Sequence, residues 1–399
     1  MNRIRKIALI IPLLLFSSGC SNYTELNEIS FILGLGIDWS EDSNYKVTLQ
    51  IISPTDLSTG GTGGGGGNAS PVFVYTSTGN TISAAIRDAA KKITRKKDFT
   101  HVALTVIGEK AARHGIEEIV DSIIREPRVS AFMSVLVAKD STAENILNTL
   151  TPIKKVAAVA MVSKIQNVNF SLGESVNPNI FQLAENLAYT GKEIAISGVK
   201  ITDNSKGKNN LTNIQKMTPS QTFIDDLAVF RNNKLIGWLD GRDIRAVLMV
   251  QDKIEQSNFS VPCGDNKFTS LRFLEQDIKT EVDVNGNVPV IKIKDILLSL
   301  VDETGCKIKL EDVSDLIKLE KEAAKVVKKQ IVESIEHAQK YKSDVFGFGD
   351  IVHTSNPKKW KAIKNNWPEE FSKAKIDVKV TFIIKRTGLL GNPVNLKRE

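Results

Sequence analysis

The sequence predicts an α+β protein, in which strands and amphipathic helices are mixed along the chain. The chain has 399 residues, of which 41% are hydrophobic and 25% charged, as in folded proteins. Apolar and polar residues alternate in short runs such as 45–53, which is typical of half-buried strands. Apolar residues recur at helical spacing in others, such as 81–93 and 313–341. Because a single core stops growing near roughly 250–300 residues, two or three domains are expected.

The first twenty residues have the parts of a bacterial export signal. Residues 1–6 are basic, and residues 7–16 form an apolar run of about 15 Å as a helix, too short for a bilayer core of about 30 Å. This order predicts a signal peptide over residues 1–19. The small residues before Cys20 resemble a lipobox, although Ser17 stands where Leu is usual. That resemblance implies cleavage before Cys20, which would carry S-diacylglycerol and N-palmitoyl groups. The alternative is a structural cysteine after an ordinary signal peptide.

The mature chain is expected to start with an N-terminal α+β domain over residues 20–195. Residues 21–28 are polar and predict a short tether. The pattern predicts strands at 29–37, 45–53, 72–76, 102–106 and 131–138, and helices at 81–93, 116–125, 141–150 and 178–189. A capping box starting at Ser141 marks the third helix. The glycine run at 63–67 predicts a long flexible connection, because no helix start with a Lys-Ser/Thr pair follows to make a phosphate loop.

Residues 196–256 are expected to be a small middle domain, or else a bridge between two larger domains. They contain a strand at 194–202, a hairpin whose strands flank Asn232 and Asn233, and a helix at 244–254. The C-terminal α+β domain is expected over 257–399. It should hold strands at 268–273, 277–283, 288–298 and 376–385 and a short helix at 357–366. The long helix at 313–341 is expected to pack on a sheet, with a coiled coil as the alternative.

The sequence holds no H-E-x-x-H, G-x-S-x-G or C-x-x-C motif, and three cysteines cannot form a four-cysteine zinc site. A protein without enzymatic activity, metal or cofactor is therefore expected. The net charge of +7 is too small a bias to argue for nucleic acid. Cys263 and Cys306 could form a disulfide if their Cα atoms lie within about 7 Å. Separate thiols are favoured, because anchored proteins of such bacteria seldom depend on disulfides.

Several segments resemble the Ger(x)C family, the lipoprotein C subunits of spore nutrient-germinant receptors. The resemblance is collinear over nearly all of the mature chain. It includes Glu25–Ile29 continuing into Gly34–Asp38, Ala228–Phe230, Leu235–Leu239, Asp344–Gly349, Pro357, Trp360, Trp367 and Gly388. The resemblance implies three α+β domains around separate, mainly antiparallel sheets, and no known enzymatic activity. It implies a place on the outer face of the inner spore (cytoplasmic) membrane, beside membrane-embedded A and B subunits that respond with it to small nutrients.

Two other functions fit the N-terminal signal. A solute-binding lipoprotein would have two lobes around a cleft, and a cell-wall hydrolase would need a cluster of acids or a metal site. Trp360 and Trp367 are candidate surface aromatics for docking other subunits, with core packing as the favoured interpretation. The lysines at 358, 359, 361 and 364 could touch anionic lipid, but a solvated helix face is favoured.

Overall fold

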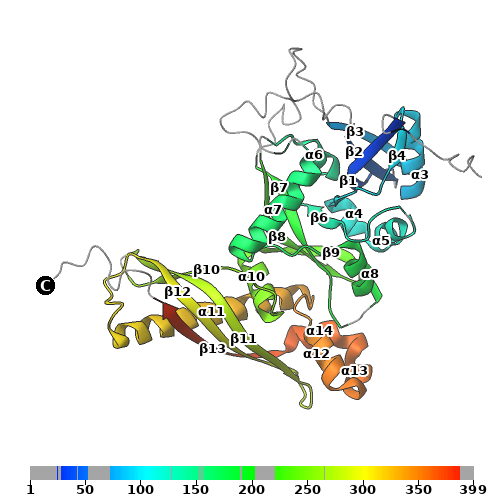
Figure 1. Ribbon diagram of the computed structural model, residues 1–399. Helices are drawn as coiled ribbons and strands as arrows, with labels where there is room; N and C mark the ends of the chain where they lie inside the picture. The colour runs from blue at the N-terminus through cyan, green and yellow to red at the C-terminus, as the bar shows by residue number, and fades with distance from the viewer. Residues whose placement is uncertain are drawn as a thin grey trace, which may run out of the picture.

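The computed structural model describes residues 25, 28–42, 44–52, 72–126, 128–151, 154, 156–188, 191–202, 221–264 and 266–386. The α+β class is confirmed: the described residues form two sheets with helices packed on them (Figure 1). The predictions for Cys20, the signal peptide and the glycine run at 63–67 fall outside the described residues.

The larger sheet is mixed and has nine strands among the described residues, in the order β3-β2-β1-β5-β6-β7-β8-β9, with β4 paired to β1. Strands β1, β5, β6 and β7 are parallel, and both flanks of the sheet continue with antiparallel strands. The strands are β1 (Ile29–Trp39), β2 (Tyr45–Ile52), β3 (Val72–Gly79), β4 (Lys96–Asp98), β5 (Leu104–Gly108), β6 (Ser134–Ala138), β7 (Ala195–Ile201), β8 (Thr222–Arg231) and β9 (Lys234–Asp240).

Helices cover both faces of this sheet, which explains why β5 and β6 are buried at every position. One face packs against α3 (Ile82–Asp88), α4 (Glu109–His114), α5 (Glu117–Ile124) and α8 (Ile180–Ala188), and α3 continues into the short η2 (Ala89–Lys91). The other face packs against α6 (Ala143–Asn148) and α7 (Ala157–Leu172).

Three local features of this half differ from the predictions. Helix α6 is capped by Thr142, whose Oγ1 accepts a hydrogen bond from the Asn145 N–H, so the cap lies one residue after Ser141. Helix α4 was not predicted, because it is only 6 residues long. Helix α7 was also missed. Lys164 is its only charged residue, so its sequence lacks the polar stripe that marks an amphipathic helix.

The strands of the expected middle domain do not form a sheet of their own. Strand β7 pairs with β6, and β8 and β9 extend the same sheet outward, so the expectation of three separate sheets is wrong for the described residues. The alternating pattern of a strand sets which face is buried but not which strand it pairs with. The predicted hairpin turn is confirmed, with Asn232 and Asn233 at φ of 50° and 62°. Helix α10 (Gly241–Val250) follows, with a capping box between Asp240 and Asp243.

The smaller sheet has the order β10-β11-β12-β13. Its strands are β10 (Asn258–Pro262), β11 (Phe268–Asp283), β12 (Val290–Thr304) and β13 (Lys375–Arg386). Strand β11 is continuous across a bulge near Phe273, where two strands were predicted. Strand β13 returns parallel to β12, while the other pairs are antiparallel. The sheets therefore contain both orientations, and the expectation of mainly antiparallel sheets holds only for the smaller one.

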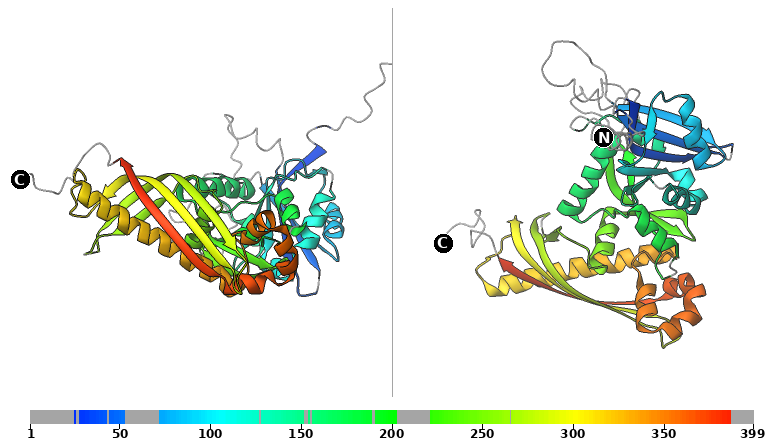
Figure 2. Two further views of the ribbon diagram at one scale, coloured as in Figure 1. Left: turned by 90° about the horizontal axis from the view of Figure 1, so that it is seen from below. Right: turned by 45° about the vertical axis from the view of Figure 1, so that its right-hand side comes forward.

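The long helix α11 (Val313–Tyr341) has the predicted bounds and lies along one face of this sheet (Figure 2). Its buried residues recur every three or four positions and join the core that the sheet forms, so the helix-on-sheet prediction is confirmed. After α11 come α12 (Phe348–Ser355), α13 (Pro357–Ile363), the short η3 (Lys364–Asn366) and α14 (Trp367–Lys373). These helices lie where the two sheets approach each other (Figure 1).

Candidate functional site at the junction of the two sheets

The segment Asp344–Gly349 is built around one buried carboxylate. The Asp344 Oδ1 accepts hydrogen bonds from the backbone N–H of Gly347 at 2.9 Å and Phe348 at 3.1 Å. Its Oδ2 accepts from the Gly349 N–H and from the Trp367 Nε1–H, both at 2.8 Å. Burial raises the pKa of Asp344 to about 6, although all four donors favour the ionised form. The segment therefore starts α12 and locks the α14 tryptophan in place.

Trp360 and Trp367 belong to this core. Both are buried, and their rings meet edge to face with centroids 5.6 Å apart. The interpretation as core residues is confirmed, and the proposed docking role of surface tryptophans is wrong. A side chain that is already enclosed by its own protein has no area left to bury against a partner.

The same segment joins the C-terminal half to the larger sheet. The Glu193 N–H donates to the Asp344 carbonyl oxygen at 3.0 Å, and the Ser343 hydroxyl donates to the Phe230 carbonyl at 2.7 Å. On the other side, the Gln251 amide donates to the Val345 carbonyl at 2.8 Å. The loop before β7, the end of β8 and the end of α10 are thus tied to one short stretch of chain.

Ionisable groups collect at this junction. Burial, with a smaller contribution from the charge of the nearby Lys253, lowers the pKa of Lys192 to about 8. Burial raises the pKa of Glu193 to about 7, with Asp344 adding to the effect. Burial also raises the pKa of Asp350, while the charge of Lys192 opposes this. Lys192, Glu193 and Asp344, with pKa values of about 8, 7 and 6, therefore change charge closer to neutral pH than unperturbed Lys, Glu or Asp side chains do.

A groove of about 790 Å³ opens beside this cluster, between the end of α10 and the segments that precede α8 and β7. Its lining includes the amide side chains of Asn177, Gln182 and Gln251 together with Lys192 and Lys253. A second hollow of about 280 Å³ lies on the other side of Lys192. Amides and charged groups of this kind can bind a small polar molecule. In the part of the chain that the structure describes, no three His, Cys, Asp or Glu side chains are placed to hold a metal ion.

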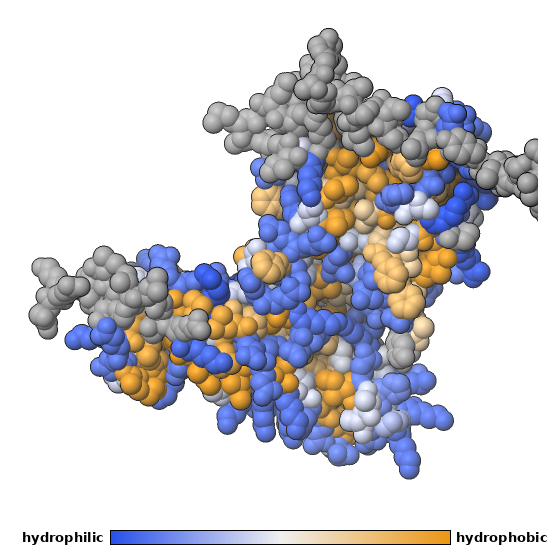
Figure 3. All heavy atoms as spheres, viewed as in Figure 1, coloured by the Kyte–Doolittle hydropathy of each residue, from blue (hydrophilic) through white to orange (hydrophobic). Residues whose placement is uncertain are grey.

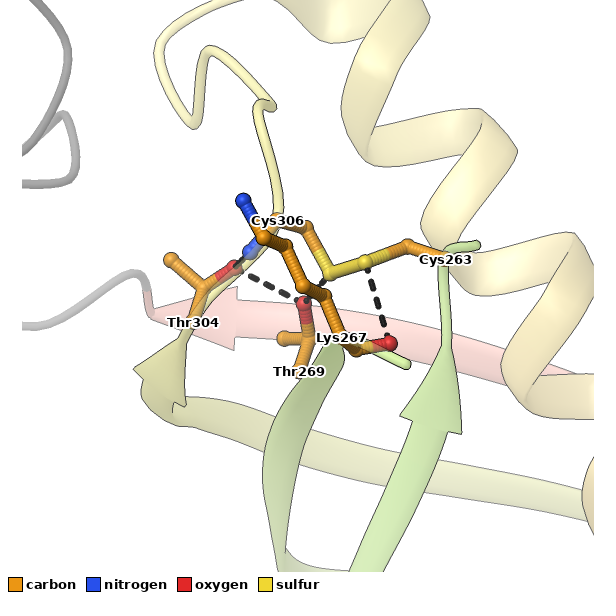
Figure 4. The surroundings of a disulfide bond; sticks show 5 residues. All are labelled: Cys263, Lys267, Thr269, Thr304 and Cys306. Atoms are coloured by element: carbon orange, nitrogen blue, oxygen red, sulfur yellow. Dashed lines mark hydrogen bonds between the residues drawn. A yellow bond between two sulfur atoms is a disulfide. The ribbon is translucent and has the colours of Figure 1, made fainter. Parts of the chain in front are cut away.

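The two C-terminal cysteines meet at the far end of the smaller sheet. Cys263 follows β10 and Cys306 follows β12, with Cα atoms 6.0 Å apart and the sulfurs bonded (Figure 4). The Thr269 hydroxyl donates to the sulfur of Cys306 at 3.1 Å, and Cys306 is buried. The folded strands thus bring the two cysteines within the distance that a disulfide needs.

The sequence pointed to some of these residues and missed others. Asp344, Trp360 and Trp367 stand in segments that were singled out for the family resemblance. Lys192 and Glu193 carried no signal, because a charged pair before a strand is common and only tertiary packing buries it. Cys20, the predicted lipidation site, lies outside the described residues, none of whose helices is long and apolar enough to cross a membrane.

Known proteins resemble this chain along its whole length. The family described as "Spore germination protein N-terminal domain" matches residues 22–201, and the family described as "Spore germination B3/GerAC like, C-terminal" matches residues 225–388. Spore germination protein KC of Bacillus subtilis (strain 168) is 31% identical over 399 residues, which cover 98% of each chain. Spore germination protein B3 of the same organism is 24% identical over 408 residues, covering 98% of this chain and 100% of the relative.

A solved structure has the same fold. The crystal structure of the GerBC protein superposes with a TM-score of 0.53 at 19% identity, covering 88% of this chain and 97% of that one. With both family regions matched in order and a relative of 31% identity over nearly its full length, the chain belongs to the GerAC-like family of spore germination proteins.

Proposed function

We propose that the chain is the lipid-anchored C subunit of a spore germinant receptor, needed for the response to small nutrients that triggers germination. The observation that carries this proposal is the collinear match to both family regions, over residues 22–201 and 225–388. The relatives named as spore germination proteins cover nearly all of the chain, so the whole molecule and not one domain is compared.

The proposed location is the outer face of the inner spore (cytoplasmic) membrane, with Cys20 as the anchor. Two acyl chains keep a protein stably bound to a membrane, whereas a single chain gives only marginal, reversible binding. Anchoring would confine the chain to a surface and so raise its effective concentration toward membrane-embedded A and B subunits. The proposal that the subunit itself catalyses no reaction rests on the family resemblance.

A Cys20→Ala variant tests the anchor. It should leave the membrane fraction and lose the germination response, because the thiol that receives the lipid is gone. Fractionation of spore membranes and mass spectrometry of the mature N-terminal peptide measure both effects. Ser17→Leu is the matched control, since it moves the lipobox toward its usual form and should keep the chain anchored. Retention of the Cys20→Ala variant in the membrane fraction would contradict the proposed anchor.

Co-purification tests the partners. The tagged chain, extracted from spore membranes in mild detergent, should bring down an A and a B subunit in comparable amounts. Its recovery without either subunit, from membranes that contain both, would contradict the receptor assignment.

The groove supports a second candidate, a solute-binding lipoprotein. Its volume of about 790 Å³ and its polar lining suit a small nutrient. This candidate predicts that the isolated chain binds a free nutrient, which calorimetry with pooled amino acids and sugars measures. A Lys192→Ala variant should then lose the heat of binding. No heat with the wild-type chain would leave the receptor subunit as the better function.

A further inference from the structure

We infer that one corner of the N-terminal half lies against the bilayer, so that the chain touches the membrane with its fold as well as with its lipid. The corner consists of Ile124, Phe132 and Phe181 and is called the apolar corner below. The inference rests on the proposed lipid anchor at Cys20.

The three side chains of the apolar corner are exposed and stand on neighbouring segments of the fold. The exposed fractions are 78% for Phe132, 50% for Phe181 and 47% for Ile124. Ile124 ends α5, and Phe132 stands in the loop that leads from α5 to β6. The Phe181 N–H in α8 donates to the Ala131 carbonyl at 3.1 Å, which places Phe181 beside Phe132. Figure 3 shows apolar side chains gathered over the α5 and α8 region of the surface.

The apolar corner lies next to the point where the chain enters the fold. Phe31, the third residue of β1, pairs with Asp98 of β4, and its ring centroid lies 4.9 Å from that of His101. Strands β1, β5 and β6 are parallel neighbours, with Gly34 level with Leu104 and Leu104 level with Ser134. The loop that carries Phe132 therefore enters β6 at the same end of the sheet where β1 starts.

The length of the tether limits which surface can reach the membrane. Glu28 lies eight positions after Cys20, and eight extended residues span at most about 28 Å. Figure 1 shows β4, α5 and α8 along one side of the molecule, with the start of α11 on the opposite side. A lipid on Cys20 therefore brings the side with the apolar corner to the bilayer and keeps the far end of the smaller sheet away from it.

A bilayer suits this corner better than a protein partner does. Stable protein interfaces bury roughly 800 Å² on each partner, from about 20–30 residues. Three projecting apolar side chains offer much less, whereas binding at the headgroup boundary grows with the apolar area buried there and adds to the affinity of a lipid anchor. Arg125 and Arg128 stand next to them in the chain, both exposed and in ion pairs with Asp121 and Glu126. Exposed ion pairs are weak, so the long stems of these arginines let their charged heads reach phosphate groups. The contact would hold the groove and the junction in one orientation toward membrane-embedded partners.

Other exposed apolar residues serve as controls. Phe170 is 54% exposed near the end of α7. That end adjoins the entry to the smaller sheet, because an added Cβ at Gly173 would lie 3.0 Å from the Gln256 carbonyl oxygen. Phe170 therefore matches Phe181 in residue type and exposure but stands on another part of the molecule.

Photo-crosslinking in membranes tests the orientation. The full chain is expressed in a host that processes lipoproteins, with p-benzoylphenylalanine replacing Phe132, Phe181 or Phe170 in separate variants. The exposed positions tolerate the larger ring without repacking of the core. After irradiation, mass spectrometry should find severalfold more lipid adduct at positions 132 and 181 than at position 170.

The outcomes separate this orientation from the anchor on which it rests. A chain that stays in the membrane fraction with a lipidated Cys20, but forms equal lipid adducts at all three positions, overturns the orientation alone. Adducts to protein in place of lipid at positions 132 and 181 also overturn it, in favour of a protein partner. A chain that is released from membranes with an unmodified Cys20 overturns the anchor and the orientation together.

Discussion

Two buried aspartates show how the surroundings of a residue decide its protonation. Asp344 accepts four hydrogen bonds, which offset part of the cost of burying its charge. Asp295 in β12 is 1% exposed, and neither of its carboxylate oxygens has a hydrogen-bond partner among the described residues. It stands on the inward face between Ile293 and Leu297. Burial, with smaller contributions from the charges of Asp252 and Asp277, raises the pKa of Asp295 to about 7.

An Asp295→Asn variant should change how stability depends on pH. Because the pKa of Asp295 rises from 3.8 to about 7 on folding, the folded state keeps a proton that the unfolded state releases. The wild-type protein therefore loses stability between about pH 4 and pH 7, by up to about 1.4 kcal/mol for each pH unit. Asn cannot ionise, so the variant should gain stability relative to wild type as pH rises. Urea unfolding at pH 5 and pH 8 measures this.

The matched control is Asp377→Asn, an exposed carboxylate on the neighbouring strand β13. It should leave the pH dependence unchanged. If the unfolding free energies of wild type and the Asp295→Asn variant changed equally with pH, Asp295 would be ionised or solvated in the folded protein.

A Gly349→Ala substitution should destabilise the junction core. An added Cβ would lie 2.4 Å from the Gly191 carbonyl oxygen and 2.8 Å from the Trp367 Nε1. Backbone on one side and a packed indole on the other leave no room to adjust, so a loss of about 1–3 kcal/mol is expected. At Gly286 the nearest atom would be 3.7 Å away, and Gly286→Ala should be tolerated. Equal melting temperatures for the two variants would contradict the tight packing.

At the scale of elements, the long hairpin of the smaller sheet needs support along its length. Strands β11 and β12 have 16 and 15 residues, whereas strands usually have about 5–6. Helix α11 covers the inward face, and the disulfide joins β10 to β12 near the ends of the strands, beside the Thr269 and Thr304 pair. The outward face keeps exposed apolar residues such as Leu274 and Ile296.

The Cys263–Cys306 pair should be oxidised in the protein at its proposed place outside the cytoplasm. Thiol titration under denaturing conditions should then detect two more thiols after reduction than before it. The bond closes a loop with a sequence separation of 43, so a Cys263→Ser and Cys306→Ser double variant should lose roughly 2–4 kcal/mol of unfolding free energy. Reductant should lower the stability of wild type but not of the variant. Full thiol reactivity without reductant would show that the bond does not form.

At the scale of the whole molecule, one short segment connects the two sheets, whose strands come from different parts of the chain. Residues 343–349 contact the loop before β7, the end of β8 and the end of α10, and they position α12 and α14 through Asp344. A motion of one sheet relative to the other would change these contacts, together with those that α10 makes to β8 and α11. The ionisable groups beside them have pKa values of about 6 to 8, so this junction responds to pH near neutrality.

An Asp344→Ala variant should loosen the two halves without unfolding either sheet. It leaves four buried N–H donors without their acceptor, and a buried donor left unsatisfied costs about 1–3 kcal/mol. Amide hydrogen exchange should quicken in residues 191–195 and 343–352 while β5 and β6 stay protected. Asp344→Asn is the control, because it keeps one acceptor oxygen and the side-chain volume. Uniform quickening across both sheets would show global destabilisation in place of a junction effect.

The amino-acid sequence by itself determined most of the element types, the bounds of α11, the Asn232–Asn233 hairpin and the family, since these depend on local periodicity, turn residues and collinear motifs. Tertiary structure alone decided that β7 to β9 extend the first sheet, that Trp360 and Trp367 are enclosed, and that Lys192, Glu193 and Asp344 meet. The physical reason is that a local pattern sets which face of a strand or helix is buried. Strand partners and buried charges depend on contacts between residues that are far apart in the chain.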